Sequence, residues 1–386
     1  LYLTGGLSEA FDEAAFEALR SRAGQRLGLR VDAAGLTLDA EVEAVSHEAP
    51  STEHRTAPIE APDAETTNTV TTEAEATSME DLLEAPLLEL GAFDDAQGAK
   101  ALGAAHLWQL AGQTFEVFFA PPGMVVAAGL CEACLAQDSA RQQRYESALE
   151  RLVGCDQAAL PELCAELREV ILEVSVPAQL VKDVRERFGA HARLMVRSSS
   201  NVEDRDDDAG AGLYDTVANV GLDDEGEALE AAIQQVWASL WGERAALARR
   251  RQGFDQRDAR MAVLLQPLVA GELSFILHSS DPFADHESER CAYAEVAVGH
   301  GEILASGGVS GSPFRLRCDK RPGGEVETLS FASFDVALWP GEAGQLEARH
   351  VDYRDVAISA DEPRRALGQH LAMVANTLQE ALGGPQ

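Results

Sequence analysis

The stretch from Leu194 to Thr216 combines residue types that suit a phosphate chain. It reads LMVRSSSNVEDRDDDAGAGLYDT, so an apolar run ends on Arg197 and is followed by three serines (198–200) and an acidic turn. A guanidinium at the end of a buried strand can bind phosphate through two parallel hydrogen bonds. The serines add hydroxyls and backbone N–H groups that favour an anion. The alternative is an arginine paired with Glu203 or Asp204 on a surface turn, and this stretch alone leaves both interpretations open.

Three further positions offer groups that a nucleotide needs. Lys100 follows Gly98 at the start of a predicted helix, where an ammonium can reach a phosphate and the glycine allows close backbone approach. Gln266 lies inside the apolar run AVLLQPLV, so its amide must be satisfied by the backbone or by a ligand. Pro267 leaves the strand edge open there, which suits an adenine. Glu302 follows a glycine-flanked turn, where a carboxylate suits ribose hydroxyls or a metal ion.

Composition limits the classes of partner. The chain has 386 residues and a formal net charge of −34, a balance that repels nucleic acid and anionic membranes. Any anionic ligand must therefore meet locally concentrated cations or a metal ion. No apolar run is long enough to span a bilayer. The chain begins LYLTGG without methionine, and we interpret it as an internal fragment of a longer protein.

Of the six cysteines, only Cys131 and Cys134 form a CxxC pair. No second pair follows at the spacing of a zinc site, so we expect two small residues on one face of a helix. We expect all six to be free thiols in a reducing compartment.

The chain divides by pattern into four segments. Residues 1–42 predict a helix and two strands, near 27–31 and 36–42, and are the tail of a small α/β unit. Residues 43–82 lack aromatic residues and are rich in Glu, Thr, Ala and Pro, which predicts a disordered linker. Helices and strands then alternate over residues 83–257, and a pattern of period two predicts a β-rich segment over residues 258–386.

Within these segments, helices are predicted at about 98–111, 140–153, 158–190 and 227–251, with a final helix before residue 383. We expect Trp237 and Trp241 to be core residues of a long amphipathic helix. The runs MAVLLQPLV and ELSFILHSS are predicted to form a hairpin through Ala270 and Gly271. This order of elements predicts an α+β fold with two lobes.

Three blocks of the chain together resemble the nucleotide-binding region of the dikinases, the pyruvate phosphate dikinase type of ATP-grasp domain. They read MVRSSSNVEDRDDDAGAGLYDTVANV, QVWASLWGERAALARRRQGFDQRDARMAVLLQPLVAGELSFILHSSDP and YAEVAVGHGEILASGGVSGSPFRL. The resemblance covers residues 85–386, and residues 1–42 weakly. The words VWASL, SFILH and ILASG are most similar to the starch-phosphorylating branch, the phosphoglucan and α-glucan, water dikinases.

The resemblance implies a domain order and a reaction. Residues 1–42 would end a swivelling phosphohistidine domain, 43–82 would be the linker, and 83–257 and 258–386 the two ATP-grasp lobes, the second incomplete. The β-phosphate of ATP would pass to a histidine and then to a glucan hydroxyl, the γ-phosphate would go to water, and AMP would leave. The histidine loop is expected upstream of residue 1 and the last ATP-grasp element downstream of residue 386, so no catalytic residue is assigned here.

The resemblance also implies residue roles. Lys100 and Arg197 would clamp the phosphates with Ser198 beside them, Gln266 would lie by the adenine, and Glu302 by the ribose or a metal ion. Mg²⁺ is the expected ion, ATP and a phosphorylated α-glucan held by other domains are the expected partners, and a plastid is the expected location.

One four-residue segment and one single residue depart from the family pattern. The residues 205–208, an arginine and three aspartates, replace a small apolar loop, and these carboxylates would repel a triphosphate unless they face solvent or metal. His300 replaces an apolar residue. The alternatives are another dikinase, of the pyruvate phosphate dikinase or phosphoenolpyruvate synthase type, and a degenerate nucleotide-binding protein without activity.

Overall fold

The computed structural model describes residues 28–32, 35–39, 78–90, 97–114, 117–202, 212–222, 225–283, 288–305, 309–342 and 344–386. The chain forms two units, one of residues 3–72 and one of residues 73–386 together with residues 1–2. In the smaller unit, β1 (Gly28–Asp32) and β2 (Gly35–Asp39) form the two strands that the sequence predicts, and they pair as an antiparallel hairpin. The predicted N-terminal helix and the acidic turn at 203–211 lie outside the described residues.

Residues 43–77 of the predicted linker also lie outside the described residues. The prediction of disorder was wrong for the end of the linker, where α2 (Met79–Glu84) forms. Its start is fixed by a capping box, in which the Ser78 hydroxyl accepts from the Asp81 N–H at 3.1 Å and the Asp81 carboxylate accepts from the Ser78 N–H. Leu82 and Leu83 then pack against the main hydrophobic core. A local cap and two apolar contacts therefore outweigh the polar composition of the segment.

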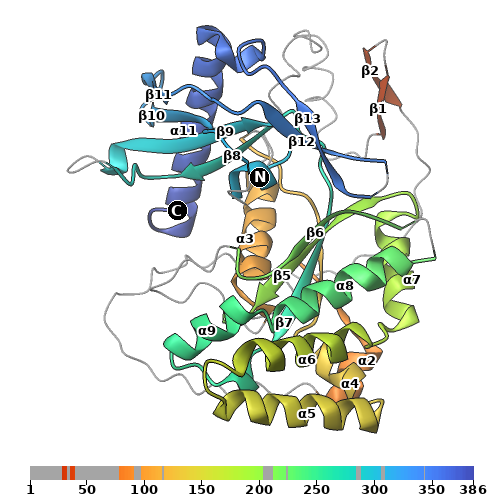
Figure 1. The fold of residues 1–386 in the computed structure, drawn as a ribbon. Coiled ribbons are helices and arrows are strands. Elements are labelled where there is room, and N and C mark those ends of the chain that lie inside the picture. Colours follow the sequence, from red (N-terminus) through yellow and green to blue (C-terminus); the bar gives the residue numbers. More distant parts are fainter. Residues whose placement is uncertain are drawn as a thin grey trace, which may run out of the picture. The chain divides into compact units, whose positions relative to one another are not determined.

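A five-stranded antiparallel sheet is the centre of the larger unit (Figure 1). Its strands, in spatial order, are β3 (Leu87–Glu89), β4 (Met124–Val126), β7 (Met261–Pro267), β5 (Arg193–Ser200) and β6 (Thr216–Gly221). The strand β7 is central and pairs with β4 and β5, so the predicted hairpin between β7 and the next strand was wrong. The strand β7 is apolar on both faces and is buried along almost its whole length. A central position, between two strands and with helices on both faces of the sheet, suits such a strand.

A helical layer lies on one side of this sheet (Figure 1). Its helices are α4 (Leu130–Leu135), α5 (Ser139–Gly154), α6 (Leu160–Leu172), α7 (Ala178–Phe188), α8 (Glu227–Ser239) and α9 (Glu243–Arg251), followed by the short η3 (Gln256–Asp258). Within the layer, α8 packs against β5, β6 and β7, α6 against α8, and α5 against α6. Two predicted long helices are each divided in two. Pro177 precedes α7, and proline cannot continue a helix without loss of a hydrogen bond. Gly242 stands between α8 and α9 in an extended conformation.

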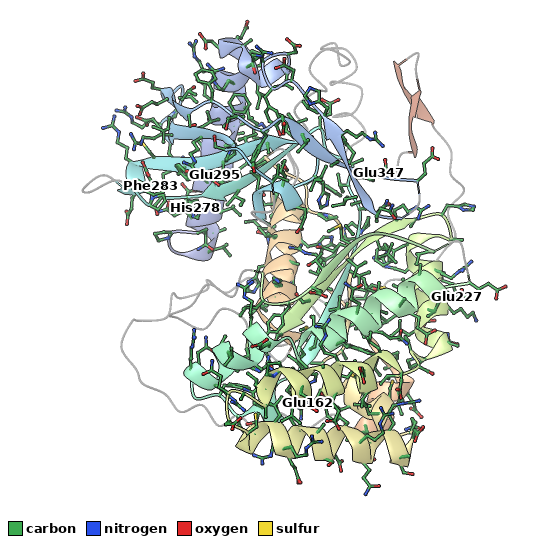
Figure 2. All side chains as sticks on the ribbon, viewed as in Figure 1. Glu162, Glu227, His278, Phe283, Glu295 and Glu347 are labelled. Carbon is green, nitrogen blue, oxygen red and sulfur yellow. The ribbon has the colours of Figure 1, made fainter. Side chains whose placement is uncertain are left out.

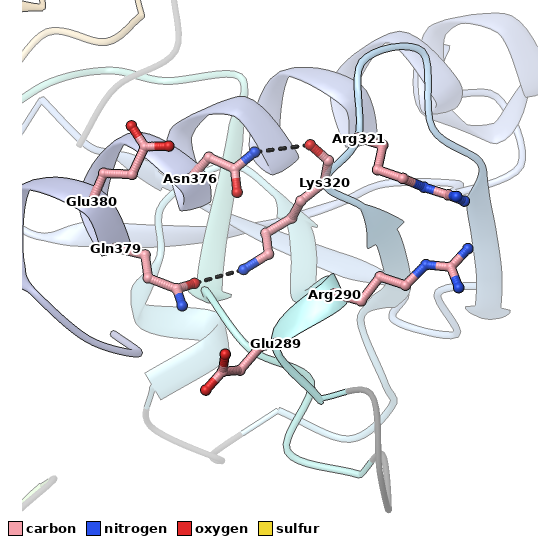
Figure 3. Close-up of a pocket in the computed structure, with 7 residues that line it drawn as sticks. All are labelled: Glu289, Arg290, Lys320, Arg321, Asn376, Gln379 and Glu380. Carbon is pink, nitrogen blue, oxygen red and sulfur yellow. Dashed lines mark hydrogen bonds between the residues drawn. The ribbon is translucent and has the colours of Figure 1, made fainter.

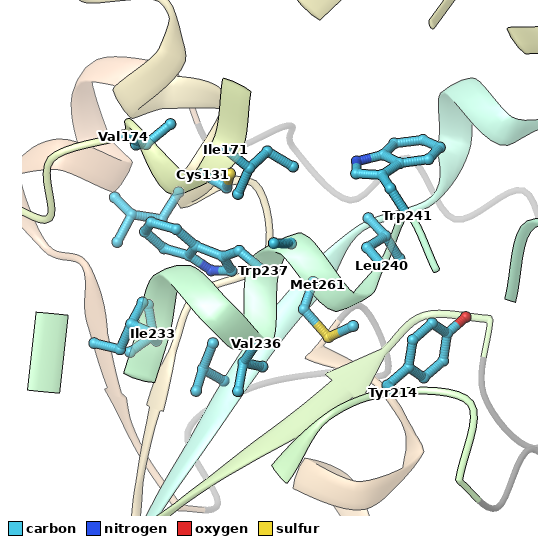
Figure 4. Packing of buried hydrophobic residues seen from close by; sticks show 14 of the residues in the cluster. Cys131, Ile171, Val174, Tyr214, Ile233, Val236, Trp237, Leu240, Trp241 and Met261 are labelled. Carbon is cyan, nitrogen blue, oxygen red and sulfur yellow. The ribbon is translucent and has the colours of Figure 1, made fainter. Parts of the chain in front are cut away.

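The helical layer holds the main core (Figure 4). Trp237 and Trp241 are 1% and 0% exposed, which confirms their prediction as core residues. They pack with Ile171 from α6 and Met261 from β7. Cys131 and Cys134 are buried in α4 as free thiols, as the packing interpretation predicts. Burial raises the pKa of Cys134 to about 11, so this thiol is protonated at neutral pH.

The other face of the five-stranded sheet carries α3 (Ala99–Gln113). Ala101 and Ala105 of this helix form a second small core with Ala262 and Leu264 of β7. Side chains alternate across a strand, so Gln266 lies on this face with Leu264. In β5, Val196 packs into the main core on the helical side. Arg197 is therefore directed to the α3 face.

A second sheet of four antiparallel strands follows, in the order β11 (Val326–Ser330), β10 (Phe314–Asp319), β9 (Cys291–Val298) and β8 (Leu273–His278). The long α11 (Asp361–Leu382) packs along it (Figure 1). The connecting elements are η4 (Ser288–Arg290), α10 (Glu302–Ala305), the hairpin of β12 (Val336–Pro340) and β13 (Leu346–His350), and η5 (Ala357–Ser359). Helices and antiparallel sheets in two lobes make the fold α+β, as predicted.

Among the described residues, side-chain hydrogen bonds connect elements of the first lobe with elements of the second lobe. The side-chain Nδ2 of Asn219, in β6, donates to the carbonyls of Gly341 at 2.7 Å and Gln345 at 3.0 Å, at the turn of the β12–β13 hairpin. His370 Nε2, in α11, lies 2.7 Å from the carbonyl oxygen of Val117. Among the described helices, none has both the length and the apolarity needed to cross a bilayer.

Candidate functional site

Lys100 stands in the first turn of α3, directly above the end of β5. Its Nζ donates to the Ser198 hydroxyl at 3.2 Å. The helix begins after Gly98, whose φ of +83° is favourable for glycine and unfavourable for other residues. A Cβ at Gly98 would lie 2.6 Å from the Ser200 carbonyl oxygen, so only glycine lets the helix start approach the strand. Glycine is therefore required two residues before Lys100 because the backbone there lies against β5.

Arg197 lies on the α3 face of the sheet, beside Gln266. The Nη1 of Arg197 donates to the Gln266 Oε1 at 3.2 Å. Gln266 is only 8% exposed, and its amide oxygen is satisfied by this guanidinium. The structure therefore brings Gln266 to the predicted phosphate clamp.

The three serines are strand residues, so the prediction that the strand ends at Arg197 was wrong. The strand β5 continues to Ser200, and the serines 198–200 are fully buried. Their hydroxyls bind protein groups: Ser198 accepts from Lys100, Ser199 contacts the start of α3, and Ser200 accepts from the Val202 N–H at 3.2 Å. β-pairing to β7 along residues 261–263 explains the longer strand. The hydroxyls of Ser198 and Ser199 therefore connect β5 to the start of α3.

Glu302 begins α10, on the turn that carries His300. The Glu302 N–H donates to His300 Nδ1 at 3.2 Å, and the His300 N–H donates to the Leu338 carbonyl at 2.7 Å. Burial lowers the pKa of His300, and the positive charge of Arg197 lowers it further. The turn of Glu302 is therefore within electrostatic reach of Arg197. The sequence indicated His300 only as a departure from an apolar pattern and gave no sign of this proximity.

Acidic side chains project from both lobes, among them Glu162 on α6, Glu227 on α8 and Glu347 on β13 (Figure 2). Lys100 lies in the first turn of α3 and donates to Ser198, the neighbour of Arg197 in β5. The N–H groups of a helix start and its dipole favour an anion. The arrangement can bind a phosphate chain.

A separate cleft of about 400 Å³ lies on the second lobe, between β10, η4 and α11 (Figure 3). Its cations are bound to the protein: Lys320 Nζ donates to the Ser279 carbonyl at 2.9 Å and to Gln379 Oε1 at 2.6 Å. Arg290 and Arg321 both donate to Asp319. Burial also lowers the pKa of Lys320. These contacts connect η4, the end of β10 and α11.

The two lobes, the antiparallel sheets and the cationic helix start define an α+β nucleotide-binding domain of the two-lobed ATP-grasp type. Comparison with known families matches residues 95–386 to the pyruvate phosphate dikinase AMP/ATP-binding domain. The chain belongs to this family. The resemblance seen in the sequence is confirmed at this level, and the chain is an ATP-binding domain of dikinase type.

Several curated relatives share part of the chain. A rifampicin phosphotransferase of Streptomyces sviceus is 34% identical over 243 residues, which cover 62% of this chain and 27% of that protein. The chloroplastic α-glucan water dikinase of Solanum tuberosum is 26% identical over 322 residues, covering 75% of this chain and 20% of that protein. A phosphoenolpyruvate synthase of Pseudomonas aeruginosa is 30% identical over 190 residues, covering 46% and 23%. The chain thus spans less than a third of each of these three relatives, and they do not single out the glucan branch.

Proposed function

We propose that Lys100 and Arg197 hold the phosphates of ATP in a dikinase that passes the β-phosphate to an acceptor. The observation that carries this proposal is their convergence: the Lys100 ammonium binds the hydroxyl of Ser198, the residue next to Arg197, across 98 positions of sequence. The ammonium, at a helix start, is thereby set beside the strand position next to Arg197. This is the arrangement that phosphate recognition requires.

Each proposed contact has a physical reason. Lys100 acts as a point charge, and its bond to Ser198 limits where the ammonium can lie. Arg197 presents a planar fork, which Gln266 orients from the side. Glu302, on the turn near Arg197, is proposed to contact the ribose or a metal ion. Phosphoryl transfer depends mainly on positioning and charge neutralisation, so these groups contribute by holding the nucleotide in place.

Magnesium fits these residues as an ion shared with the nucleotide. Within the described ranges, no three His, Cys, Asp or Glu side chains gather in a way that could hold a metal ion. Mg²⁺ in nucleotide sites is usually bound through one or two carboxylates, with phosphate oxygens and water completing its shell. Glu302 would supply the carboxylate of the protein. The ion would offset phosphate charge in a chain of net charge −34.

For the whole protein, we propose the two-step reaction of a glucan, water dikinase. The β-phosphate would move to a histidine of a swivelling domain, whose tail is residues 1–42, and then to a hydroxyl of a starch-like glucan. Water would take the γ-phosphate and AMP would leave. The similarity to potato α-glucan water dikinase over 75% of this chain supports this acceptor. A plastid location belongs to this proposal, since that relative is chloroplastic.

A small hydroxylated molecule is the second candidate acceptor. The higher identity of 34% to a rifampicin phosphotransferase favours it. Acceptor choice depends on other domains, so the nucleotide site described above serves either reaction equally.

The deciding experiment uses the intact protein and ATP labelled on the β-phosphate or on the γ-phosphate. Separate reactions contain phosphorylated starch glucan, rifampicin, or pyruvate as acceptor. The proposal predicts β-label on glucan and γ-label as free phosphate. β-Label on rifampicin would select the second candidate, and β-label on pyruvate a phosphoenolpyruvate synthase. ATP binding without β-transfer to any of the three would contradict all three acceptors.

A further inference from the structure

We propose that Ser199 is a positioning residue that fixes Lys100 for ATP by capping α3 from the neighbouring strand. This inference rests on the proposed role of Lys100 and Arg197 as phosphate ligands. It assigns to Ser199 a task that no residue of α3 performs. The hydroxyl lies on the α3 face of β5, two positions after Arg197, and is fully buried.

The start of α3 lacks a cap of its own. Its N-cap residue is Gly98, which has no side chain to bond the first N–H groups, and the first turn has no acidic residue. A helix start leaves N–H groups without intrahelical partners, and a Ser, Thr, Asp or Asn at the N-cap usually binds one. Here the Ser199 hydroxyl accepts from the Ala101 N–H at 3.0 Å. A strand residue 98 positions away thus supplies the missing cap.

The same hydroxyl also holds the residue before the helix. Ser199 Oγ donates to the Gln97 carbonyl at 2.6 Å. Gln97 is fixed in turn, because its Oε1 accepts from the Ala128 N–H at 2.8 Å. One hydroxyl therefore binds the backbone on both sides of Lys100, at residues 97 and 101.

The start of α3 packs closely against Ser199. At Gly98, a Cβ would lie 2.7 Å from the Ser199 hydroxyl oxygen. Ala101 is 0% exposed and lies against the second small core. With its backbone held at two points, Lys100 directs its Nζ to Ser198, the neighbour of Ser199 in β5. A single strand thus sets the positions of both proposed phosphate ligands, Arg197 directly and Lys100 through Ser199.

Loss of the hydroxyl should loosen the backbone on both sides of Lys100 and remove the acceptor of the buried Ala101 N–H. The predicted effect falls on ligands with a phosphate chain, because only these use the ammonium. In the intact protein, Ser199→Ala should raise the Kd for ATP with Mg²⁺ by roughly tenfold, the change that one lost hydrogen bond of ordinary strength produces. Adenosine, which has no phosphate, should bind as it does to wild type. Isothermal titration calorimetry measures both.

Two further variants separate positioning from general damage to the fold. Ser199→Cys keeps the approximate size of the side chain but is a weak hydrogen-bonding group, so it should fold and show the same selective loss. Ser239→Ala is the matched control, since Ser239 is also a buried serine, with its hydroxyl bonded to the Val236 carbonyl within the helical layer. It should bind ATP as wild type does.

A double-mutant cycle then tests whether Ser199 acts through Lys100. Lys100→Gln alone should weaken ATP binding, and adding Ser199→Ala should change the Kd less than twofold further, because the two residues serve one contact. ATP binding by both Ser199 variants equal to wild type, or equal losses for ATP and adenosine, would overturn the inference while the proposed function stands. A wild-type protein that does not bind ATP would instead contradict the proposed function.

Discussion

Arg197 Nη1 donates to Gln266 Oε1 at 3.2 Å, from a position two residues beyond the one that faces Gln266 across the β5–β7 pair. Such diagonal neighbours lie on one face of a sheet, within reach of a long side chain. The contact satisfies a buried amide oxygen and at the same time fixes the plane of the guanidinium. Gln266, which the sequence associated with adenine, thus contacts the arginine that we propose as a phosphate ligand.

This contact predicts that Gln266→Leu weakens binding of ATP and GTP by the same factor. Without this acceptor, the Arg197 guanidinium loses one of the contacts that orient it, and a loss of roughly tenfold in each affinity is expected. Titration calorimetry with both nucleotides measures the ratio.

The control is Gln256→Leu. Gln256 is also buried and accepts from a guanidinium, that of Arg249 at 2.8 Å, but it lies in the helical layer. This variant should lose stability and keep its ATP affinity. If Gln266→Leu weakened ATP alone and spared GTP, then Gln266 would read the base, contrary to our account.

Gly98, directly before α3, and Gly103, within it, form a matched pair for substitution by alanine. At Gly98, the φ of +83° and a Cβ 2.6 Å from the Ser200 carbonyl oxygen should make alanine destabilising by about 2 kcal/mol or more. At Gly103, nothing lies within 4 Å of the added Cβ, so alanine should stabilise the helix by about 0.5–1 kcal/mol. Urea unfolding measures both. Similar effects of the two substitutions would show that the helix start is not held against β5.

His300 predicts a specific dependence of stability on pH. Burial and Arg197 lower its pKa below the ordinary value of 6.5, so the neutral imidazole is favoured in the folded state. A lowered pKa gives stability that is complete above pH 6.5 and is lost as the pH falls through the folded-state pKa. His300→Gln cannot take up this proton. The stability of wild type relative to the variant should therefore fall between pH 7.5 and pH 5, measured by urea unfolding, and a constant difference would contradict the assignment.

Asn219 predicts a graded loss at the contact between β6 and the β12–β13 turn. Its φ is +62°, and its side chain donates to two carbonyls. Asn219→Gly removes both hydrogen bonds but tolerates the backbone, at a cost of about 1–3 kcal/mol. Asn219→Ala should cost about 1 kcal/mol more, because alanine resists a positive φ. Equal losses in chemical denaturation would show that the backbone at residue 219 is not constrained.

The local features of the chain were predicted better than the pairing of the strands. Lys100 and Arg197 were predicted as phosphate ligands because cation type and glycine position are local features. Trp237 and Trp241 were placed in the core because helical spacing is also local. The contact of Lys100 with Ser198, next to Arg197, depends on the packing of α3 against β5, two segments that are far apart in sequence.

The errors have the same origin. A turn signal at Ala270 and Gly271 favours a hairpin, but β7 gains more burial in the centre of the five-stranded sheet than beside β8. The serines after Arg197 have turn-forming side chains, yet pairing to β7 keeps them extended. The role of Ser199 gives no local signal at all, because the helix that it caps begins 100 residues earlier.

The most direct test of the account is titration of ATP with Mg²⁺ into the intact wild-type protein and into its Arg197→Ala variant. Arg349→Ala is the control, since Arg349 is an exposed arginine on β13 paired with Glu347. We predict that ATP binds and thermally stabilises wild type and the control. Arg197→Ala should bind ATP at least tenfold more weakly, as loss of a charge-assisted contact of about 1.5–3 kcal/mol requires, and should lose the thermal shift. An affinity and a thermal shift unchanged by Arg197→Ala would contradict the phosphate clamp.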